Sequence, residues 1–153
     1  MKNVKTSIFA FISAFLMIFT VNATADSVSN SVVGAGGYDL VSYQTGKKPL
    51  PGNGNFVATV DGVNYIFSSK ANLETFNKNQ DKYLPQYGGY CAFGATVSKK
   101  FIGDPNVWEV VDGKLYFNLD NNVKSIWVKD ISGNIETADV NWKKIKDVPA
   151  SQL

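Results

Sequence analysis

The segment Trp108-Glu109-Val110-Val111-Asp112-Gly113-Lys114-Leu115-Tyr116-Phe117-Asn118 decides the fold of this chain. An Asp-Gly pair between two arms rich in β-branched and aromatic residues is the strongest short signal for a two-residue hairpin turn. The same Val-Asp-Gly turn occurs at residues 60–62, between the β-rich arms 56–60 and 63–67. The sequence therefore predicts two antiparallel hairpins.

A helical pattern follows the first hairpin. Ser69 is a suitable N-cap for a helix in which Leu73 and Phe76 share a face, and we expect this helix to end near Asn79. A second short turn, residues 81–84, should stop at Pro85, because the residue before a proline is driven out of the helical region.

A helical pattern also follows the second hairpin. We expect Asn121 or Asn122 to open a helix with Val123, Ile126 and Trp127 on one face. Ser132-Gly133 should break it, and a last helical segment should run through Ile135, Ala138 and Trp142. The fold class predicted is α+β: a single small domain with two antiparallel hairpins, each followed by helix.

The two Val-Asp-Gly turns start 51 positions apart, at Val60 and Val111. A divergent ββα duplication explains this spacing, and so does chance hairpin chemistry. The domain is expected to span residues 37–145, after a flexible leader at 26–36 and before a C-terminal tail at 146–153.

The first 25 residues read as a secretory signal peptide. Lys2 and Lys5 supply a positive n-region, residues 8–21 form an apolar stretch, and Ala23-Thr24-Ala25 offers a cleavage site before Asp26. The apolar stretch is shorter than the about 20 residues that a membrane span needs. We therefore expect a periplasmic or secreted protein that has no membrane contact after cleavage.

Composition excludes several classes of function. The chain has no histidine, which rules out Ser-His-Asp and Cys-His catalysis and imidazole-bound metals. It also has no arginine, the residue that binds phosphate and guanine with two hydrogen bonds. Two of its fifteen lysines lie in the signal peptide, and the remaining thirteen only balance the thirteen acidic residues. Nucleic acid is not expected as a partner.

The only cysteine, Cys91, lies in a loop with an unusual composition of glycines and aromatic residues. Glycines free the backbone for positive φ, and aromatic rings are expected to wall in the sulfur. The predicted binding loop consists of Tyr87, Gly88, Gly89, Tyr90, Cys91, Phe93 and Gly94. In an oxidising compartment a single cysteine is a packed thiol, a reactive thiol, a metal ligand or an intermolecular bridge.

Several motifs together resemble the exported, stand-alone YHS-domain proteins of bacteria, over residues 37–142. They are Gly37-Tyr38-Asp39, Tyr65-Ile66-Phe67-Ser68-Ser69, Tyr87-Gly88-Gly89-Tyr90-Cys91-Ala92-Phe93-Gly94 and Val111-Asp112-Gly113-Lys114-Leu115-Tyr116. In some members of that group selenocysteine fills the position matching Cys91, which implies a chemically special residue. YHS relatives bind metal through two cysteines whose positions here match Ser68 and Asn72, and these are poor ligands for soft metals. The resemblance therefore implies the fold more than the usual metal site.

Three functions follow as expectations. The leading one is a binding module, rather than an enzyme, in which Cys91 is the soft ligand of copper(I) or zinc and shares the metal with a small thiol, a homodimer partner or another protein. The second is a thiol-based redox protein, a peroxide or disulfide sensor in which Cys91 is the catalytic group and an external thiol resolves it. The third is a structural or interaction domain.

Other polar residues are expected to have structural roles. Lys99 and Lys100 should face solvent, and Asp39 should cap the turn after Gly36-Gly37. The tyrosines at 83, 87 and 90 should fill the core and its rim, and the three tryptophans should anchor the core.

Overall fold

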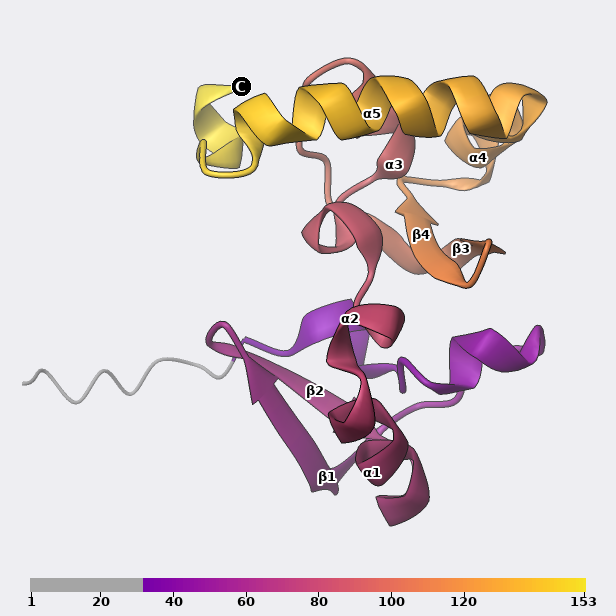
Figure 1. Ribbon diagram of the computed structural model, residues 1–153, viewed down its shortest axis with the longest axis vertical. Helices are drawn as coiled ribbons and strands as arrows, with labels where there is room; N and C mark the ends of the chain where they lie inside the picture. Colours follow the sequence, from indigo (N-terminus) through magenta and orange to yellow (C-terminus); the bar gives the residue numbers. More distant parts are fainter. Residues whose placement is uncertain (1–31) are drawn as a thin grey trace, which may run out of the picture.

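The computed structural model describes residues 32–153, and the predicted signal peptide and its cleavage site lie outside these residues. The architecture is α+β, as predicted, with two separate two-stranded antiparallel sheets, each followed by helix. The elements form two halves that are stacked along the longest axis of the molecule (Figure 1). No helix among the described residues is long and apolar enough to cross a membrane.

The first half contains the hairpin of β1 (Asn53–Val60) and β2 (Val63–Phe67) and the helices α1 (Lys70–Lys78) and α2 (Gln80–Tyr83). Two 3-10 turns precede the hairpin, η1 (Gly34–Gly37) and η2 (Ser42–Thr45). The Ser69 hydroxyl accepts a hydrogen bond from the Asn72 amide at 3.2 Å, which confirms the predicted cap of α1.

The second half begins with the 3-10 turn η3 (Gln86–Gly89) and the short helix α3 (Ala92–Thr96). The hairpin of β3 (Asp104–Val111) and β4 (Lys114–Asn118) follows. Then come α4 (Asn121–Trp127), η4 (Val128–Asp130), the long helix α5 (Ile131–Ile145) and η5 (Ala150–Gln152). Helix α5 crosses the outer face of this half (Figure 1).

The prediction that Ser132-Gly133 ends the helix opened by Asn121 or Asn122 was wrong. The two residues lie in the first turn of α5, and the break comes earlier, at Asp130. The Asp130 carboxylate accepts a hydrogen bond from the Gly133 amide at 2.9 Å, so Asp130 is the N-cap. Glycine suits position 133 because a Cβ there would crowd the Asp130 carboxylate that caps the helix. The prediction that Asn121 or Asn122 opens α4 is confirmed, since Asn121 is its first residue, and Asp120 is the N-cap.

The expected flexible leader also overlaps the folded part. The Asn64 amide donates to the Val32 carbonyl at 2.8 Å, and Val33 forms a parallel bridge with Asn64 beside β2. The chain is therefore part of the fold from Val32 rather than from Gly37, since its backbone groups pair with the edge of the hairpin.

The two halves repeat the same local plan. In each hairpin the register shifts at the same place, between Asn53 and Val57 in β1 and between Asp104 and Trp108 in β3. Both turns have left-handed residues at Asp-Gly, with φ 49° and 77° in the first and 50° and 76° in the second. These coincidences favour a duplication over two unrelated hairpins.

The loops before the hairpins repeat as well. Residues 35–37 have φ values of 51°, 57° and 81°, and residues 87–89 have 55°, 61° and 82°. An extended residue follows each loop and bridges to the segment just before the hairpin, Tyr38 to Pro51 and Tyr90 to Ile102. Asp39 in the first half and Cys91 in the second therefore hold the same place in the backbone plan.

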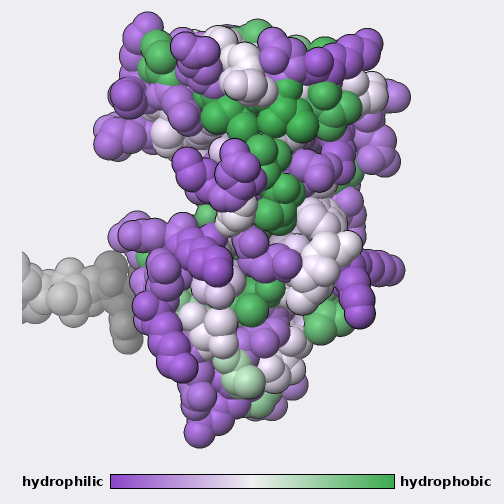
Figure 2. All heavy atoms as spheres, turned by 45° about the vertical axis from the view of Figure 1, so that its right-hand side comes forward, coloured by the Kyte–Doolittle hydropathy of each residue, from purple (hydrophilic) through white to green (hydrophobic). Residues whose placement is uncertain are grey.

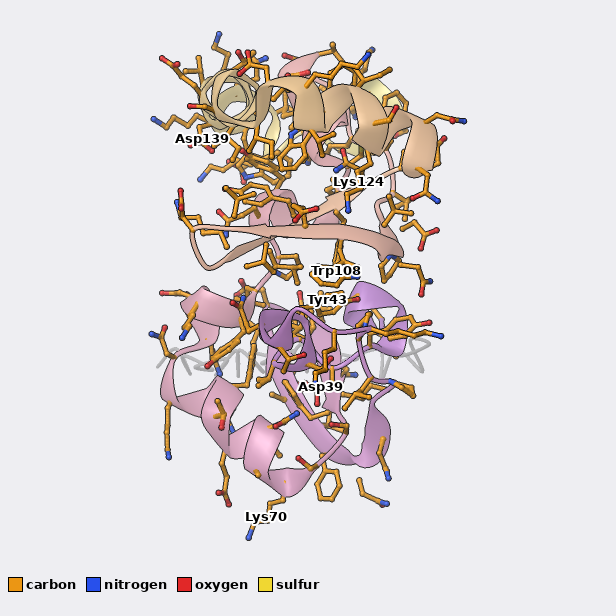
Figure 3. The ribbon with its side chains drawn as sticks, turned by 90° about the vertical axis from the view of Figure 1, so that its right-hand side faces the viewer. Asp39, Tyr43, Lys70, Trp108, Lys124 and Asp139 are labelled. Carbon is orange, nitrogen blue, oxygen red and sulfur yellow. The ribbon has the colours of Figure 1, made fainter. Side chains whose placement is uncertain are left out.

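One core joins the halves. Leu115 and Phe117 of β4 pack with the buried residues of the first half, among them Leu40, Phe67 and Phe76. The Tyr43 ring meets the Trp108 ring edge-on at 5.4 Å, and the Tyr43 hydroxyl donates to the Pro105 carbonyl at 2.9 Å. Figure 3 shows Tyr43 and Trp108 facing each other at the boundary between the halves. A second cluster, which includes Tyr116, Trp127 and Ala138, lies between β4 and α5.

Candidate functional site

The loop around Cys91 is held by its backbone. Tyr87, Gly88 and Gly89 all have positive φ, and the chain then turns extended so that the Cys91 amide donates to the Phe101 carbonyl at 2.8 Å. The Cys91 carbonyl accepts from the Ala95 amide at 3.1 Å, which starts α3. The predicted fixed position of the sulfur therefore follows from strand-like pairing on one side and a helical turn on the other.

The thiol itself is buried, with 1% of the residue exposed. Its sulfur accepts a hydrogen bond from the Gly94 amide at 3.4 Å and donates to Asn118 Oδ1 at 3.8 Å. Gly94 has no side chain, and this leaves room for the half-exposed ring of Phe101. A Cβ at position 94 would stand 2.9 Å from that ring. The Phe101 ring thus packs against Gly94, whose amide donates to the sulfur.

The aromatic residues of the loop pack mainly against α5 and β4. The Tyr87 ring lies 5.9 Å from Tyr116 and 5.7 Å from Trp142, and the Tyr87 hydroxyl donates to Asp139 Oδ1 at 2.9 Å. Burial and the Asp139 carboxylate raise the pKa of Tyr87 above its ordinary value of 10.0. The ring of Tyr90 lies 6.2 Å from Trp142. These contacts fix the loop, and Tyr87 fills the core as expected.

The prediction that Lys100 simply faces solvent was wrong. Its ammonium donates to the carbonyls of Lys146 and Val148, at 2.8 and 2.7 Å, and lies 5.2 Å from the Trp142 ring centre. This lysine therefore ties the start of the predicted C-terminal tail to the Cys91 loop, because two carbonyls and an aromatic face satisfy its charge.

Asn118 is a site residue that the sequence did not single out. It is completely buried at the end of β4, and its Oδ1 accepts from the Phe93 amide at 3.4 Å as well as from the Cys91 thiol. Its Nδ2 has no hydrogen-bond partner among the residues that the structure describes. The signal that could have found it is the repeat: Phe67, 51 positions earlier, holds the matching place in β2 and is a buried aromatic.

In the first half, the position that matches Cys91 is occupied by Asp39, whose side chain has all its hydrogen bonds satisfied within the protein. Asp39 is fully buried, and its carboxylate accepts hydrogen bonds from donors on three segments. These donors are the Val41 amide (2.9 Å), the Ser42 amide (3.4 Å), the Ser68 amide (2.8 Å), the Ser68 hydroxyl (2.6 Å) and Asn72 Nδ2 (2.7 Å).

The expected turn cap at Asp39 is therefore only part of its role. Ser68 and Asn72 donate hydrogen bonds that stabilise a buried structural carboxylate. Figure 3 shows Asp39 pointing into the interior of the first half.

A cleft of about 460 Å³ lies between the two halves, where both glycine loops reach the surface. The molecule narrows at this level in the space-filling view (Figure 2). The lining is mainly apolar and includes Val33, Gly36, Gly89, Tyr90 and Ile102, but not Cys91. The thiol and the cleft are therefore separate features of the same loop.

Residues 32–153 contain no group of three or more His, Cys, Asp or Glu side chains that could hold a metal ion. Ligands from outside this part of the chain would be required for a metal at Cys91. Comparisons with protein-family models, curated proteins and solved structures give no match. The fold and the site define a small α+β domain of two similar halves with one buried thiol beside a buried carboxamide.

Proposed function

We propose that this chain is a small exported YHS-like module whose functional group is the Cys91 thiol, used in redox chemistry with a small oxidant. The observation that carries this proposal is the difference between the halves. In the first half the position is closed by a fully hydrogen-bonded aspartate, whereas in the second a thiol lies beside a buried carboxamide with an unused donor. An unsatisfied buried donor costs about 1–3 kcal/mol, so its presence favours a role that a packed core residue does not need.

The burial of Cys91 restricts what can react with it. A residue that is 1% exposed is reached by a large reagent only when the loop opens, whereas hydrogen peroxide is hardly larger than water. The chain has no second cysteine, so regeneration needs an external thiol.

The proposal is tested by the rate at which Cys91 is oxidised in the folded and in the denatured protein. We expect hydrogen peroxide to oxidise the folded chain at least as fast as the denatured chain, and iodoacetamide to alkylate the folded chain more slowly. Mass spectrometry after quenching measures both, and Cys91→Ser is the control that should gain no mass. If both reagents react more slowly with the folded protein at every pH from 5 to 9, the thiol is a packing residue and the proposal is wrong.

Metal binding through Cys91 is the alternative to the redox proposal, since a thiolate is a soft ligand for copper(I) or zinc. It requires a partner chain or a small thiol to complete the coordination, because one thiolate is too few ligands. Titration of the reduced protein with Zn(II) and Cu(I) tests it. Uptake that disappears in Cys91→Ser, with less than one metal per chain, supports a shared site, and no uptake at micromolar metal contradicts it.

Export is proposed from the charged n-region, the apolar stretch and Ala23-Thr24-Ala25. Expression of the full chain in a bacterium should give a periplasmic protein whose first residue is Asp26. N-terminal sequencing of the periplasmic fraction measures this, and a retained Met1 would contradict it.

A further inference from the structure

Asn118 is the least expected residue in the buried part of this molecule. Its place in the hairpin register matches Phe67, which is completely buried and packs against Phe76 at 4.8 Å between ring centres. An aromatic or aliphatic side chain at position 118 would serve packing without an unpaired polar atom of its own. The buried carboxamide at this position therefore indicates a role beyond packing, such as contact with a ligand or with a reacting group.

The orientation of the Asn118 carboxamide follows from its neighbours. The Phe93 amide is a donor and must meet an oxygen, so Oδ1 is the atom that faces Phe93 and the sulfur. Nδ2 is bonded to the same carbon as Oδ1, so it lies one amide width from the atom that contacts the sulfur. It has two N–H donors and no acceptor among the described residues. The resting thiol supplies only a weak S–H donor to this group.

We infer that Asn118 is the residue that holds the oxidised form of Cys91, and that its Nδ2 donates to the oxygen of a sulfenic acid or sulfenate formed on the sulfur. This inference rests on the proposed redox function and names the residue that stabilises the oxidised sulfur. With the Gly94 amide on the sulfur itself and the Asn118 amide on the added oxygen, both atoms of the oxidised group have a donor.

The reaction balances with two external partners, a small peroxide and a monothiol. The Cys91 thiol loses its proton and the sulfur attacks one peroxide oxygen, so an S–O bond forms, the O–O bond breaks, and the leaving oxygen takes up a proton as water or an alcohol. Sulfur loses two electrons and the peroxide gains them. One external thiol then displaces water to form a mixed disulfide, and a second thiol attacks this disulfide, which releases the Cys91 thiol and a small disulfide.

Access limits the oxidant to small molecules. The Phe101 ring covers Gly94 beside the sulfur, and the cleft between the halves is lined by Gly89 and Tyr90 rather than by Cys91. Hydrogen peroxide should therefore react faster than a bulky hydroperoxide such as cumene hydroperoxide. Replacement of the Phe101 side chain by a methyl group should reduce this preference, because its backbone carbonyl, which pairs with Cys91, is retained.

The test compares the parent protein with Asn118→Leu, and Phe101→Ala serves as the second variant. In excess hydrogen peroxide, a second molecule oxidises the sulfenic acid to the sulfinic acid. The sulfenic acid on the parent should persist about tenfold longer than on Asn118→Leu, since a hydrogen bond to a charged group is worth about one decade in an equilibrium. Mass gain at Cys91 against time measures the lifetime. In the Phe101→Ala variant, the rates of oxidation by hydrogen peroxide and by cumene hydroperoxide should differ less than in the parent. The lifetime of the sulfenic acid should stay that of the parent.

A second measurement uses the parent protein, so that the inference can be tested even if Asn118→Leu does not fold. The side-chain amide resonance of Asn118 should shift when the ¹⁵N-labelled parent is oxidised by one equivalent of peroxide, and it should return when a monothiol is added. If Asn118→Leu folds and its sulfenic acid lives as long as that of the parent, or if the amide resonance does not shift on oxidation, Asn118 has no such role although Cys91 is oxidised. If the folded parent is not oxidised at all, the redox function itself is wrong.

Discussion

Asp39 and Cys91 hold the same place in the two halves, yet their side chains need opposite surroundings. The Asp39 carboxylate is satisfied by the serine and asparagine donors of α1 and the segment before it. The residues that correspond to Ser68 and Asn72, 51 positions later, are Leu119 and Val123, which offer no side-chain donor. A thiol tolerates such surroundings and a carboxylate does not, since buried charge requires hydrogen bonds.

The first prediction at this scale concerns the Asp39 network. Asp39→Asn replaces one acceptor by a donor that faces Ser68 and Asn72, so we expect a loss of about 2 kcal/mol or more in the free energy of unfolding. Urea denaturation measures it. Asp61→Asn is the matched control and should change the free energy by less than about 0.5 kcal/mol, because Asn also accepts the left-handed turn position. Equal effects of both substitutions would contradict the structural role of the network.

The second prediction concerns alkaline pH. Burial, followed by the carboxylates of Asp139 and Asp112, raises the pKa of Tyr116 to about 12 from an ordinary value of 10.0. The folded pKa is above the unfolded one, so this contribution to stability is complete below pH 10 and is lost as the pH rises from 10 towards 12. Tyr116→Phe should therefore lose stability less steeply in this range, by at most about 1.4 kcal/mol per pH unit. Urea midpoints measured at intervals from pH 9 to 11.5 decide it, and identical slopes in parent and variant would contradict it.

At the scale of the elements, the local signals were sufficient where the determining residues are close in sequence. The Asp-Gly turns, the Ser69 cap and the stop before Pro85 were all predicted, because each depends on backbone preferences within a few residues. The start of α5 was missed because Asp130 caps it and Gly133 sits inside the first turn, where glycine ordinarily suggests a break.

The candidate site was predicted only in part for a related reason. The loop from Tyr87 to Gly94 is continuous in sequence and its composition is visible, so Cys91 was found. Asn118 reaches the sulfur from β4, 27 residues further on, and only the pairing of the two halves places it there. Lys100 reaches the carbonyls of residues 146 and 148 by the same kind of long-range contact. Such contacts depend on tertiary packing, which local patterns do not encode.

A prediction at this scale separates backbone strain from packing in the hairpin turn. Gly113 has φ 76°, and a Cβ built there meets no atom within 4 Å, so only the backbone conformation resists a side chain. Gly113→Val should destabilise the protein by about 1 kcal/mol or more. Gly54→Ala is the control, since that position is equally open and its φ is not positive. Thermal unfolding followed by circular dichroism compares the two, and a neutral Gly113→Val would contradict the turn assignment.

At the scale of the whole molecule, the duplicated halves are not independent domains. The main core contains Phe67 and Phe76 from the first half together with Leu115 and Phe117 from the second. Tyr43 adds a hydrogen bond to Pro105 and an edge-on contact with Trp108 across the boundary. Neither half can bury its apolar face without the other, so the two should unfold in one cooperative transition.

The three tryptophans provide the measurement, because Trp108, Trp127 and Trp142 all lie in the second half. Phe76→Leu changes a residue of the first half, where Phe76 is completely buried and its ring packs against Phe67 and Tyr83. We expect it to lower the urea midpoint seen by tryptophan fluorescence by the same amount as the midpoint seen by far-ultraviolet circular dichroism, with a loss of about 1 kcal/mol or more.

Lys70→Ala is the matched control for this experiment, because it lies on the exposed side of the same helix and its ion pair with Glu74 spans 3.6 Å at the surface. It should leave both midpoints within about 0.5 kcal/mol of the parent, since exposed pairs contribute little to stability. A fluorescence midpoint that stays fixed while the circular dichroism midpoint falls would mean that the second half, with Cys91 and Asn118, folds without the first. The shared core predicts the opposite result, because Leu115 and Phe117 lie on the strand that ends at Asn118 and pack against the first half.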